Sequence, residues 1–161
     1  MIATPFFMLL IGILELGLMF MASTTINAAA VAEARLVRTG QFQASGAVSQ
    51  NDFKTALCNN MSWISTADCM ANMSLDVRTF PTFSSISVPP PVVNGVLDTA
   101  QLKFDPGQSC DIVLVRVFYP WTLLAPVLEP GLPDLGSNKK LLTTAVAFRN
   151  ENWAVGGPPC S

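Results

Sequence analysis

The feature that most constrains this chain is an apolar segment at its N-terminus that contains a single ionisable side chain. Between Pro5 and Val31 that side chain is Glu15, and apart from it residues 6–21 are almost entirely Phe, Met, Leu, Ile and Gly. About 20 apolar residues in a helix cross the hydrocarbon core of a bilayer. The segment therefore predicts one membrane-spanning helix at the start of the chain.

The helix is predicted to continue beyond the membrane. Residues 26–38 are mainly strong helix formers, and the Thr-Gly pair at 39–40 is typical of a helix end. A helix that starts at Pro5 and ends there is roughly 50 Å long. We expect its last turns to stand above the lipid and to pack on the following domain through Leu36 and Val37.

Glu15 is the residue of this segment whose presence is costly. A charge at bilayer depth is unfavourable by several kcal/mol unless it is neutralised or paired, so Glu15 is expected to have a partner. Gly12 and Gly17 flank it in the helix and would let a neighbouring backbone approach closely. The three residues are thus a candidate site for helix packing and assembly. A protonated Glu15 that faces a helix or lipid without any role is the alternative.

The four cysteines all lie after the apolar segment, at Cys58, Cys69, Cys110 and Cys160. An even set of this kind favours two disulfides in an oxidising compartment. Of the three possible pairings we favour Cys58 with Cys69, because they are close in sequence, which leaves Cys110 to join Cys160. Reduced, buried cysteines are the alternative. The spacings lack the paired short loops of structural zinc sites, so no metal is predicted.

Two observations complicate the prediction of a permanent anchor. Residues 27–30 could host the cleavage site of a secretory signal, although residues 1–4 lack a basic region and the apolar run is longer than is usual for a signal. Lysine and arginine occur only after the apolar segment, which by the positive-inside rule alone would place the C-terminal part in the cytoplasm. The cysteines favour the opposite side. A basic segment upstream of residue 1 would resolve this conflict.

One short helix is predicted early in the part that follows the anchor. Residues 41–49 are small and polar, which predicts a loop. Ser49 or Asn51 is a possible N-cap of the helix after it, which ends near Met61 and places Phe53, Ala56 and Leu57 on one face.

Three segments have strand-like patterns. Residues 75–80 alternate apolar and polar side chains and are closed by Pro81. Residues 110–119 are rich in β-branched side chains and are predicted to stop at Pro120, and residues 141–150 are the expected antiparallel neighbour.

The other segments predict turns and loops. Residues 84–94 contain three consecutive prolines, cannot join a central strand and predict a loop or edge segment. Residues 105–107 predict a turn. Residues 121–138 predict at most a short helix near 122–128 and a loop.

These elements predict an α+β fold in which a long N-terminal helix continues into a small antiparallel sheet. We expect residues 1–40 to form the anchor helix and residues 41–161 to form one extracytoplasmic domain. The sheet is expected to have three or four strands, covered on one face by the end of the long helix and by the short helix.

The composition disfavours catalysis and nucleic-acid binding. The chain has no histidine, which removes the commonest general base and the commonest zinc ligand. Its carboxylates beyond the long helix show no paired spacing, and its net charge of −2 comes without any cluster of lysine or arginine that would bind phosphates. We therefore predict a protein that is not an enzyme, with no catalytic residues, no cofactor and no nucleic-acid partner.

Four segments resemble TadE-like proteins, the pseudopilins or minor pilins of the tight adherence (Flp, type IVb-like) pilus system. They are residues 12–17, 32–41, 111–121 and 147–151, and the likeness is strongest over 5–41. The resemblance implies a pilin-like fold, a single pass through the bacterial inner membrane and a periplasmic C-terminal domain. It also implies a role in assembling an adhesive pilus, with other pilin-like proteins and the assembly machinery as partners of the N-terminal helix, and with possible incorporation into the fibre.

The sequence departs from this family at its start. TadE-like proteins usually carry a basic leader, a prepilin-peptidase glycine and a Val-Glu-Phe-Ala-like segment before the Pro-Phe-Phe run, and here Met1 follows the place of that glutamate. We expect either that the start was assigned too late or that this member is not processed. Glu15 corresponds to the second, deeper glutamate of the family.

A second function agrees with the same sequence. Tyr119, Trp121 and Trp153 could line a groove, and together with the proline-rich loop they would suit a secreted or membrane-anchored binding module unrelated to pili. Aromatic residues at strand ends more often serve in packing.

Overall fold

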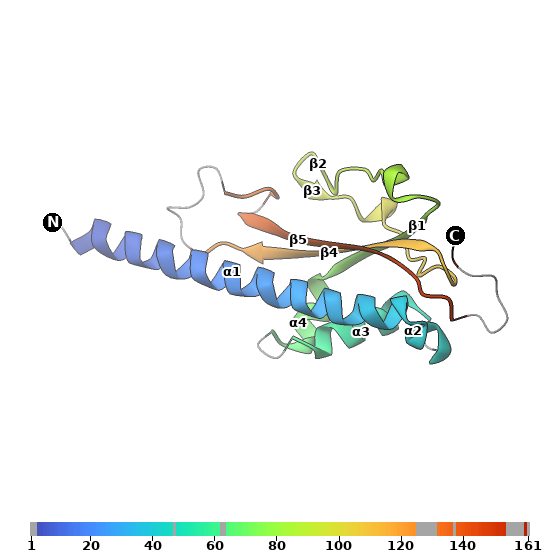
Figure 1. Cartoon of the computed structure of the whole chain (residues 1–161). Helices are drawn as coiled ribbons and strands as arrows, with labels where there is room; N and C mark the ends of the chain where they lie inside the picture. Colours follow the sequence, from blue (N-terminus) through green and yellow to red (C-terminus); the bar gives the residue numbers. More distant parts are fainter. Residues whose placement is uncertain are drawn as a thin grey trace.

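The computed structural model describes residues 3–46, 48–61, 64–124, 132–136, 138–153 and 160. A long helix runs beneath a small sheet, short helices lie beside it, and irregular segments lie over the other face of the sheet (Figure 1). The predicted α+β class is confirmed. The helices are α1 (Ala3–Arg38), α2 (Gln41–Ala44), α3 (Gln50–Asn59) and α4 (Thr66–Asn72), with 3-10 turns η1 (Phe83–Ser85) and η2 (Thr99–Gln101). The strands are β1 (Ser74–Phe80), β2 (Val92–Val93), β3 (Val96–Leu97), β4 (Ile112–Thr122) and β5 (Lys139–Arg149).

The long helix is continuous over 36 residues, as predicted. It ends where Gly40 adopts a positive φ of 74°, a conformation that glycine takes without steric cost. Trp153 packs directly on this glycine, because a Cβ added there would lie 2.5 Å from the Trp153 Cγ. The helix end is therefore fixed by both its backbone conformation and its neighbour.

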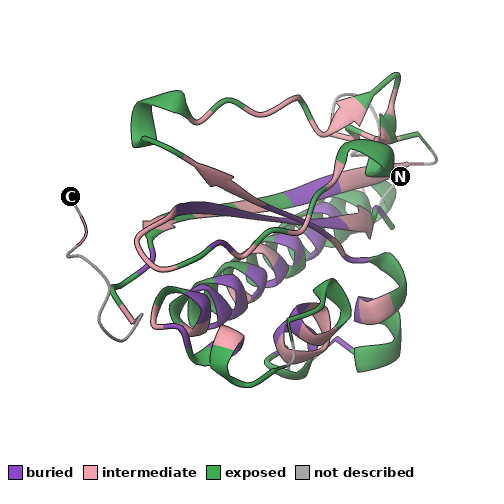
Figure 2. Ribbon diagram, turned by 90° about the vertical axis from the view of Figure 1, so that its right-hand side faces the viewer, coloured by how far each residue is buried: buried purple, intermediate pink, exposed green. Residues whose placement is uncertain are grey.

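The contact between α1 and the domain is much longer than predicted. Val37 is fully buried and Leu36 is half-buried, as expected, but burial on the same face extends back to Gly12 (Figure 2). The buried positions recur every three or four residues, which is the spacing of one helical face. They are Gly12, Glu15, Met19, Ala22, Ile26, Ala29, Ala30, Glu33, Ala34 and Val37. Five of these ten positions are glycine or alanine, which lets the sheet approach the helix closely.

The main sheet has the order β1-β4-β5 and is antiparallel throughout. The central strand β4 buries Val113, Val115 and Val117 in the core cluster that also contains α1 residues. At one end of the sheet Glu15 of α1 contacts Leu124, the second residue after β4, and at the other the Glu151 N–H donates to the Arg38 carbonyl at 2.9 Å. The helix therefore runs parallel to β5 and antiparallel to β4.

Pro120 does not end β4, contrary to the prediction. The N–H and C=O of Val77 point away from β4, where they bond to Lys103 and Asp105. The even-numbered residues are therefore the ones whose backbone groups point from β1 to β4 and from β4 to β1. Phe118 pairs with Ser74, the first residue of β1, and Pro120 lies two residues beyond it. The missing N–H of proline therefore points to a place where no strand lies opposite, and the strand continues to Thr122.

The short helices differ in part from the prediction. Ser49 caps α3 with a reciprocal bond to Asp52, and α3 ends at Asn59, close to the expected end. The predicted loop 41–49 is wrong at its start, because residues 41–44 form α2. Helix α4 was not predicted, although Ser65 accepts a bond from the Asp68 N–H at its start.

The segment between β1 and β4 covers the face of the sheet opposite α1. It contains the β2–β3 hairpin, which turns at Asn94 and Gly95 with positive φ at both residues. An Asn-Gly turn between valines is a strong hairpin signal. The expected loop or edge segment over 84–94 is confirmed, because β2 pairs with β3 and lies outside the main sheet. The expected helix near 122–128 is absent at residues 122–124, and the remainder lies outside the described residues.

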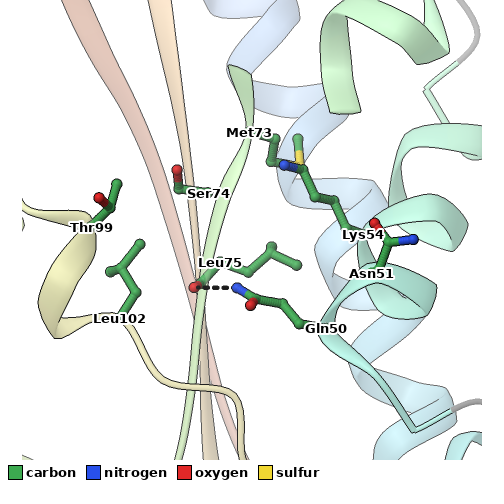
Figure 3. Close-up of a pocket in the computed structure, with 8 residues that line it drawn as sticks. All are labelled: Gln50, Asn51, Lys54, Met73, Ser74, Leu75, Thr99 and Leu102. Atoms are coloured by element: carbon green, nitrogen blue, oxygen red, sulfur yellow. Dashed lines mark hydrogen bonds between the residues drawn. The ribbon is translucent and has the colours of Figure 1, made fainter. Parts of the chain in front are cut away.

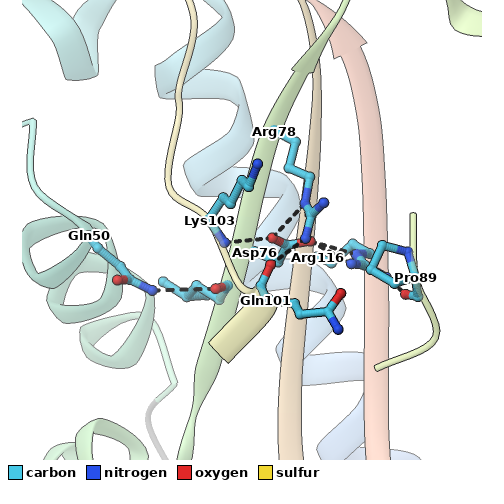
Figure 4. A network of polar contacts seen from close by, with 8 residues as sticks. Gln50, Asp76, Arg78, Pro89, Gln101, Lys103 and Arg116 are labelled. Atoms are coloured by element: carbon cyan, nitrogen blue, oxygen red, sulfur yellow. Dashed lines mark hydrogen bonds and ion pairs between the residues drawn. The ribbon is translucent and has the colours of Figure 1, made fainter. Parts of the chain in front are cut away.

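A buried ion pair fixes this covering segment to the sheet (Figure 4). Asp76 of β1 is fully buried and accepts bonds from Arg116 of β4 at 2.5 Å and from Arg78 at 2.9 Å. The two arginines also donate to backbone carbonyls of the covering segment, at Pro89 and Gln101. Charges taken out of water are thus paired and hydrogen-bonded.

Two disulfides join the described cysteines, Cys58 to Cys69 and Cys110 to Cys160. This is the pairing that the sequence favoured. The first joins α3 to α4, and the second ties residue 160 to the turn before β4, so both brace the domain around the sheet.

Candidate functional site

The candidate site is the N-terminal half of α1, up to Met21, where the helix has two faces of different character. One face is buried against the domain, as described above. The other exposes large apolar side chains from Phe6 to Met21, among them Phe20, which is 72% exposed. This helix is long and apolar enough to cross a membrane, although length and composition alone do not distinguish an anchor from a signal sequence.

Glu15 lies on the buried face and contacts its own domain. Its side chain is almost inaccessible, with 3% of the residue exposed, and its Oε1 accepts a hydrogen bond from the Leu124 N–H at 2.5 Å. Leu124 is the second residue after the end of β4. The expected partner of the glutamate therefore includes a backbone donor of the same chain, which apolar patterning does not reveal.

The two glycines of the predicted assembly site lie on different sides of α1. Gly12 is buried on the same face as Glu15. Gly17 is exposed on the other face, where an added Cβ would meet nothing within 4 Å. Contacts of these residues with other chains stay a prediction.

The C-terminal half of α1 is docked on the domain by polar contacts that the sequence did not predict. Asn27 accepts a bond from the Thr144 hydroxyl of β5 at 2.7 Å. Glu33, which is buried, accepts one from the Asn60 side chain at 2.6 Å. These residues are far apart in sequence, and no local pattern pairs them. They fix the rotation of the helix about its axis relative to the sheet.

The aromatic residues considered for a binding groove serve in packing. Tyr119 is buried and donates a bond to Asp68 at 2.5 Å, and burial together with this carboxylate raises the pKa of the Tyr119 hydroxyl. Trp121 packs against the core, and Trp153 lies on Gly40 at the far end of α1. The three residues therefore do not gather at one place.

An open cavity of about 360 Å³ lies between α3 and the edge of β1 (Figure 3). Its lining is Gln50, Asn51, Lys54, Met73, Ser74, Leu75, Thr99 and Leu102. Lys54 is the one titratable side chain among these, and burial lowers its pKa. Within the described ranges no three Cys, Asp or Glu side chains gather in a way that could hold a metal ion. The cavity offers no acid and base pair.

Comparison with curated proteins and with solved structures finds no match for this chain. One family model does match, and the matched segment contains the candidate site: the apolar face of α1, Glu15 and the start of the docked C-terminal half of the helix. Residues 1–35 match the family model of TadE-like proteins, which confirms over this segment the resemblance that the sequence shows to that family.

Proposed function

We propose that this chain is a pseudopilin or minor pilin of a tight adherence pilus and acts without catalysis. In this proposal residues 1–40 anchor it in the bacterial inner membrane and residues 41–161 form its periplasmic domain. One observation carries the proposal: the TadE-like segment forms a helix with one face docked on a small sheet domain and the other face apolar and free for lateral contacts. The match of residues 1–35 to a family of pilus components supports this general role.

The packing of α1 also favours a retained anchor over a cleaved secretory signal. Cleavage after Ala30 would remove seven of the ten buried residues of α1, from Gly12 to Ala30. The sheet would then lose cover that includes Ile26 and Ala22, both essentially inaccessible. A domain released in this way would expose a large apolar surface to water, which costs free energy in proportion to its area.

The outward face of α1 supports lateral packing among pilin-like helices. Without a hydrophobic driving force in lipid, helices associate through close packing, and small residues permit it. Gly17 supplies such a position between the exposed Leu14 and Leu18. We propose that neighbouring helices pack here, while Gly12 and Glu15 contribute by holding the domain on the opposite face.

Deletion of the gene tests the proposal. The expected result is the loss of surface pili and of adhesion, with both restored by a plasmid copy of the full chain. The matched control is a copy that lacks residues 3–21, which should not enter the membrane and should not restore pili. Normal pili and adhesion in the deletion strain would contradict the proposed role. A mature protein that begins near Val31 would instead support the secreted binding module.

Replacement of Glu15 separates its docking role from membrane insertion. Glu15→Leu is expected to insert normally, because the segment becomes more apolar, but to recover fewer pilin-like partners on co-purification. The substitution leaves the Leu124 N–H without this acceptor, which costs about 1–3 kcal/mol, so the docked orientation weakens roughly fivefold or more. Glu15→Gln keeps an acceptor and is the matched control. Equal recovery from Glu15→Leu and from the unmodified protein would refute the prediction.

A further inference from the structure

We propose that the end of β4, at Leu123 and Leu124, is immersed in the outer leaflet of the membrane beside α1, with Glu15 capping its backbone. This inference rests on the membrane anchor in the proposed function and adds a second point of lipid contact. The partner is a phospholipid bilayer, and the contact surface belongs to the domain and not to the helix.

The depth of Leu124 follows from its contact with α1. The outward side chains of the helix stay large and apolar as far as Phe20 and Met21, and the next exposed side chain is that of Thr24. Lipid that covers Met21 extends about 9 Å past Glu15, since six residues separate the two. Because the Leu124 N–H is bonded to Glu15, Leu124 lies at the level of Glu15 and so below the lipid surface.

Three backbone groups at this end of β4 are bonded to protein groups. The Leu123 N–H donates to the Asn138 carbonyl at 3.0 Å, and the Leu123 carbonyl accepts a bond from the Asn138 side chain at 3.3 Å. The Leu124 N–H has left the strand ladder and donates to Glu15. In lipid an unpaired backbone group costs several kcal/mol, because no water is present to bond it. These bonds allow a strand end to enter the membrane.

The side chains of this end are graded in the way that a lipid boundary favours. Leu124 is 74% exposed and has no polar atom in its side chain. Lys139 pairs with Thr122, the last residue of β4, and so lies further from the membrane core than Leu124. Lysine is typical of the headgroup level, where it reaches the anionic phosphates. The order from the core outwards is therefore leucine first and then lysine.

The same geometry accounts for the presence of Glu15 in an apolar run. A glutamate at this depth is costly in an isolated helix, but here it provides the acceptor that the submerged strand end lacks. Its Oε1 and the Leu124 N–H satisfy each other away from water. Glu15 thus acts as a positioning residue for the domain at the membrane surface.

Depth-dependent fluorescence quenching tests the inference on the full chain. One cysteine is introduced at residue 124, 14 or 83 and labelled with the fluorophore NBD, while the four native cysteines stay protected in their disulfides. The proteins are reconstituted in phosphatidylethanolamine and phosphatidylglycerol vesicles. The quenchers are a phospholipid with a nitroxide on its acyl chain, which acts in the core, and iodide, which acts in water. Residue 14 reports on the anchor, and residue 83, at the far end of the sheet, reports on the aqueous side.

The labels at 124 and 14 are both expected to lose roughly half of their emission with the nitroxide lipid, since both would lie within the hydrocarbon region, while the label at 83 responds to iodide alone. If 14 responds to the nitroxide and 124 to iodide, the anchor stands and the inference is overturned. Shielding of 124 from both quenchers would overturn it in favour of a protein contact. If 14 does not respond to the nitroxide, the membrane anchor in the proposed function fails as well.

Discussion

Asp76→Asn lowers the free energy of unfolding of the full chain in detergent by about 3–5 kcal/mol, the typical effect of breaking a buried ion pair. The carboxylate is fully buried and is bonded to Arg116, Arg78 and the Lys103 N–H. An amide in its place leaves Arg116, itself only 7% exposed, without a counter-charge in the interior. It also loosens the segment that covers the sheet. Urea unfolding followed by circular dichroism measures the loss.

The same residue makes stability depend on pH in a predictable direction. Burial by itself would raise the pKa of Asp76, but the bonds from Arg116, Lys103 and Arg78 outweigh it and hold the pKa below its ordinary value of 3.8. A carboxyl with a lowered pKa stabilises the fold above its unfolded-state pKa, and the stabilisation is lost as the pH falls through the folded-state value. The unmodified protein should therefore lose stability below about pH 4, and Asp76→Asn should lose less over the same range.

Asp134→Asn is the matched control for this prediction. Asp134 forms an ion pair with Lys140 at 2.8 Å, but its side chain is 42% exposed. Pairs of this kind contribute about 0–1 kcal/mol, because water and salt screen them. Equal losses from Asp76→Asn and Asp134→Asn would show that the buried network does not hold the covering segment.

Phe53→Ala is expected to cost about 3–5 kcal/mol, the usual range for deleting a fully buried aromatic side chain. Phe53 of α3 is inaccessible and lies at the centre of a ring cluster, 5.6 Å from Phe42 of α2 and 5.9 Å from Phe104 between centroids. The substitution leaves a cavity where α2, α3 and the segment beside β1 meet. Thermal unfolding of the full chain measures the effect as a lower melting temperature.

Phe83→Ala provides the comparison, since the same side chain is deleted from a place where 54% of it is exposed. Surface substitutions of this kind usually change stability by less than about 0.5 kcal/mol. A comparable loss from both variants would indicate that the core does not lie at the α2–α3 junction.

The parts of the fold with strong local signals were predictable from the sequence. The apolar run and the helix formers after it predicted α1 almost to its ends, and Ser49, one of two candidate caps, does start α3. The β-branched run around Val115 gave the central strand. In each case the local pattern and the tertiary packing favour the same conformation.

The features that depend on tertiary context were not predictable in the same way. Pro120 stays in β4 because β1 begins at Ser74, opposite Phe118, and does not reach the proline, a fact of register and not of sequence. Seven of the ten docked residues of α1 are Gly, Ala or Glu, which carry little apolar signal, so the extent of this face to Gly12 was missed. The Asn-Gly turn at Asn94 and the Ser65 cap of α4 were visible signals that were overlooked.

The sequence predicted that Glu15 has a partner, but only the structure shows which group that partner is. Its cost within an apolar run predicted that it has a partner. The Leu124 N–H lies 109 residues away in the sequence and is a backbone group, so no side-chain pattern identifies it. Only the antiparallel course of α1 and β4 brings the two together.

Site-specific photo-crosslinking in intact cells tests most directly the claim that the outward face of α1 packs against other membrane helices. A photoreactive phenylalanine analogue is placed at Leu14 or Phe20, which are 60% and 72% exposed on α1, and at Phe83 as the control. The account predicts adducts with small pilin-like membrane proteins from positions 14 and 20 and none with such proteins from position 83. Adducts with lipid alone at both helix positions, in cells that assemble pili, would contradict it.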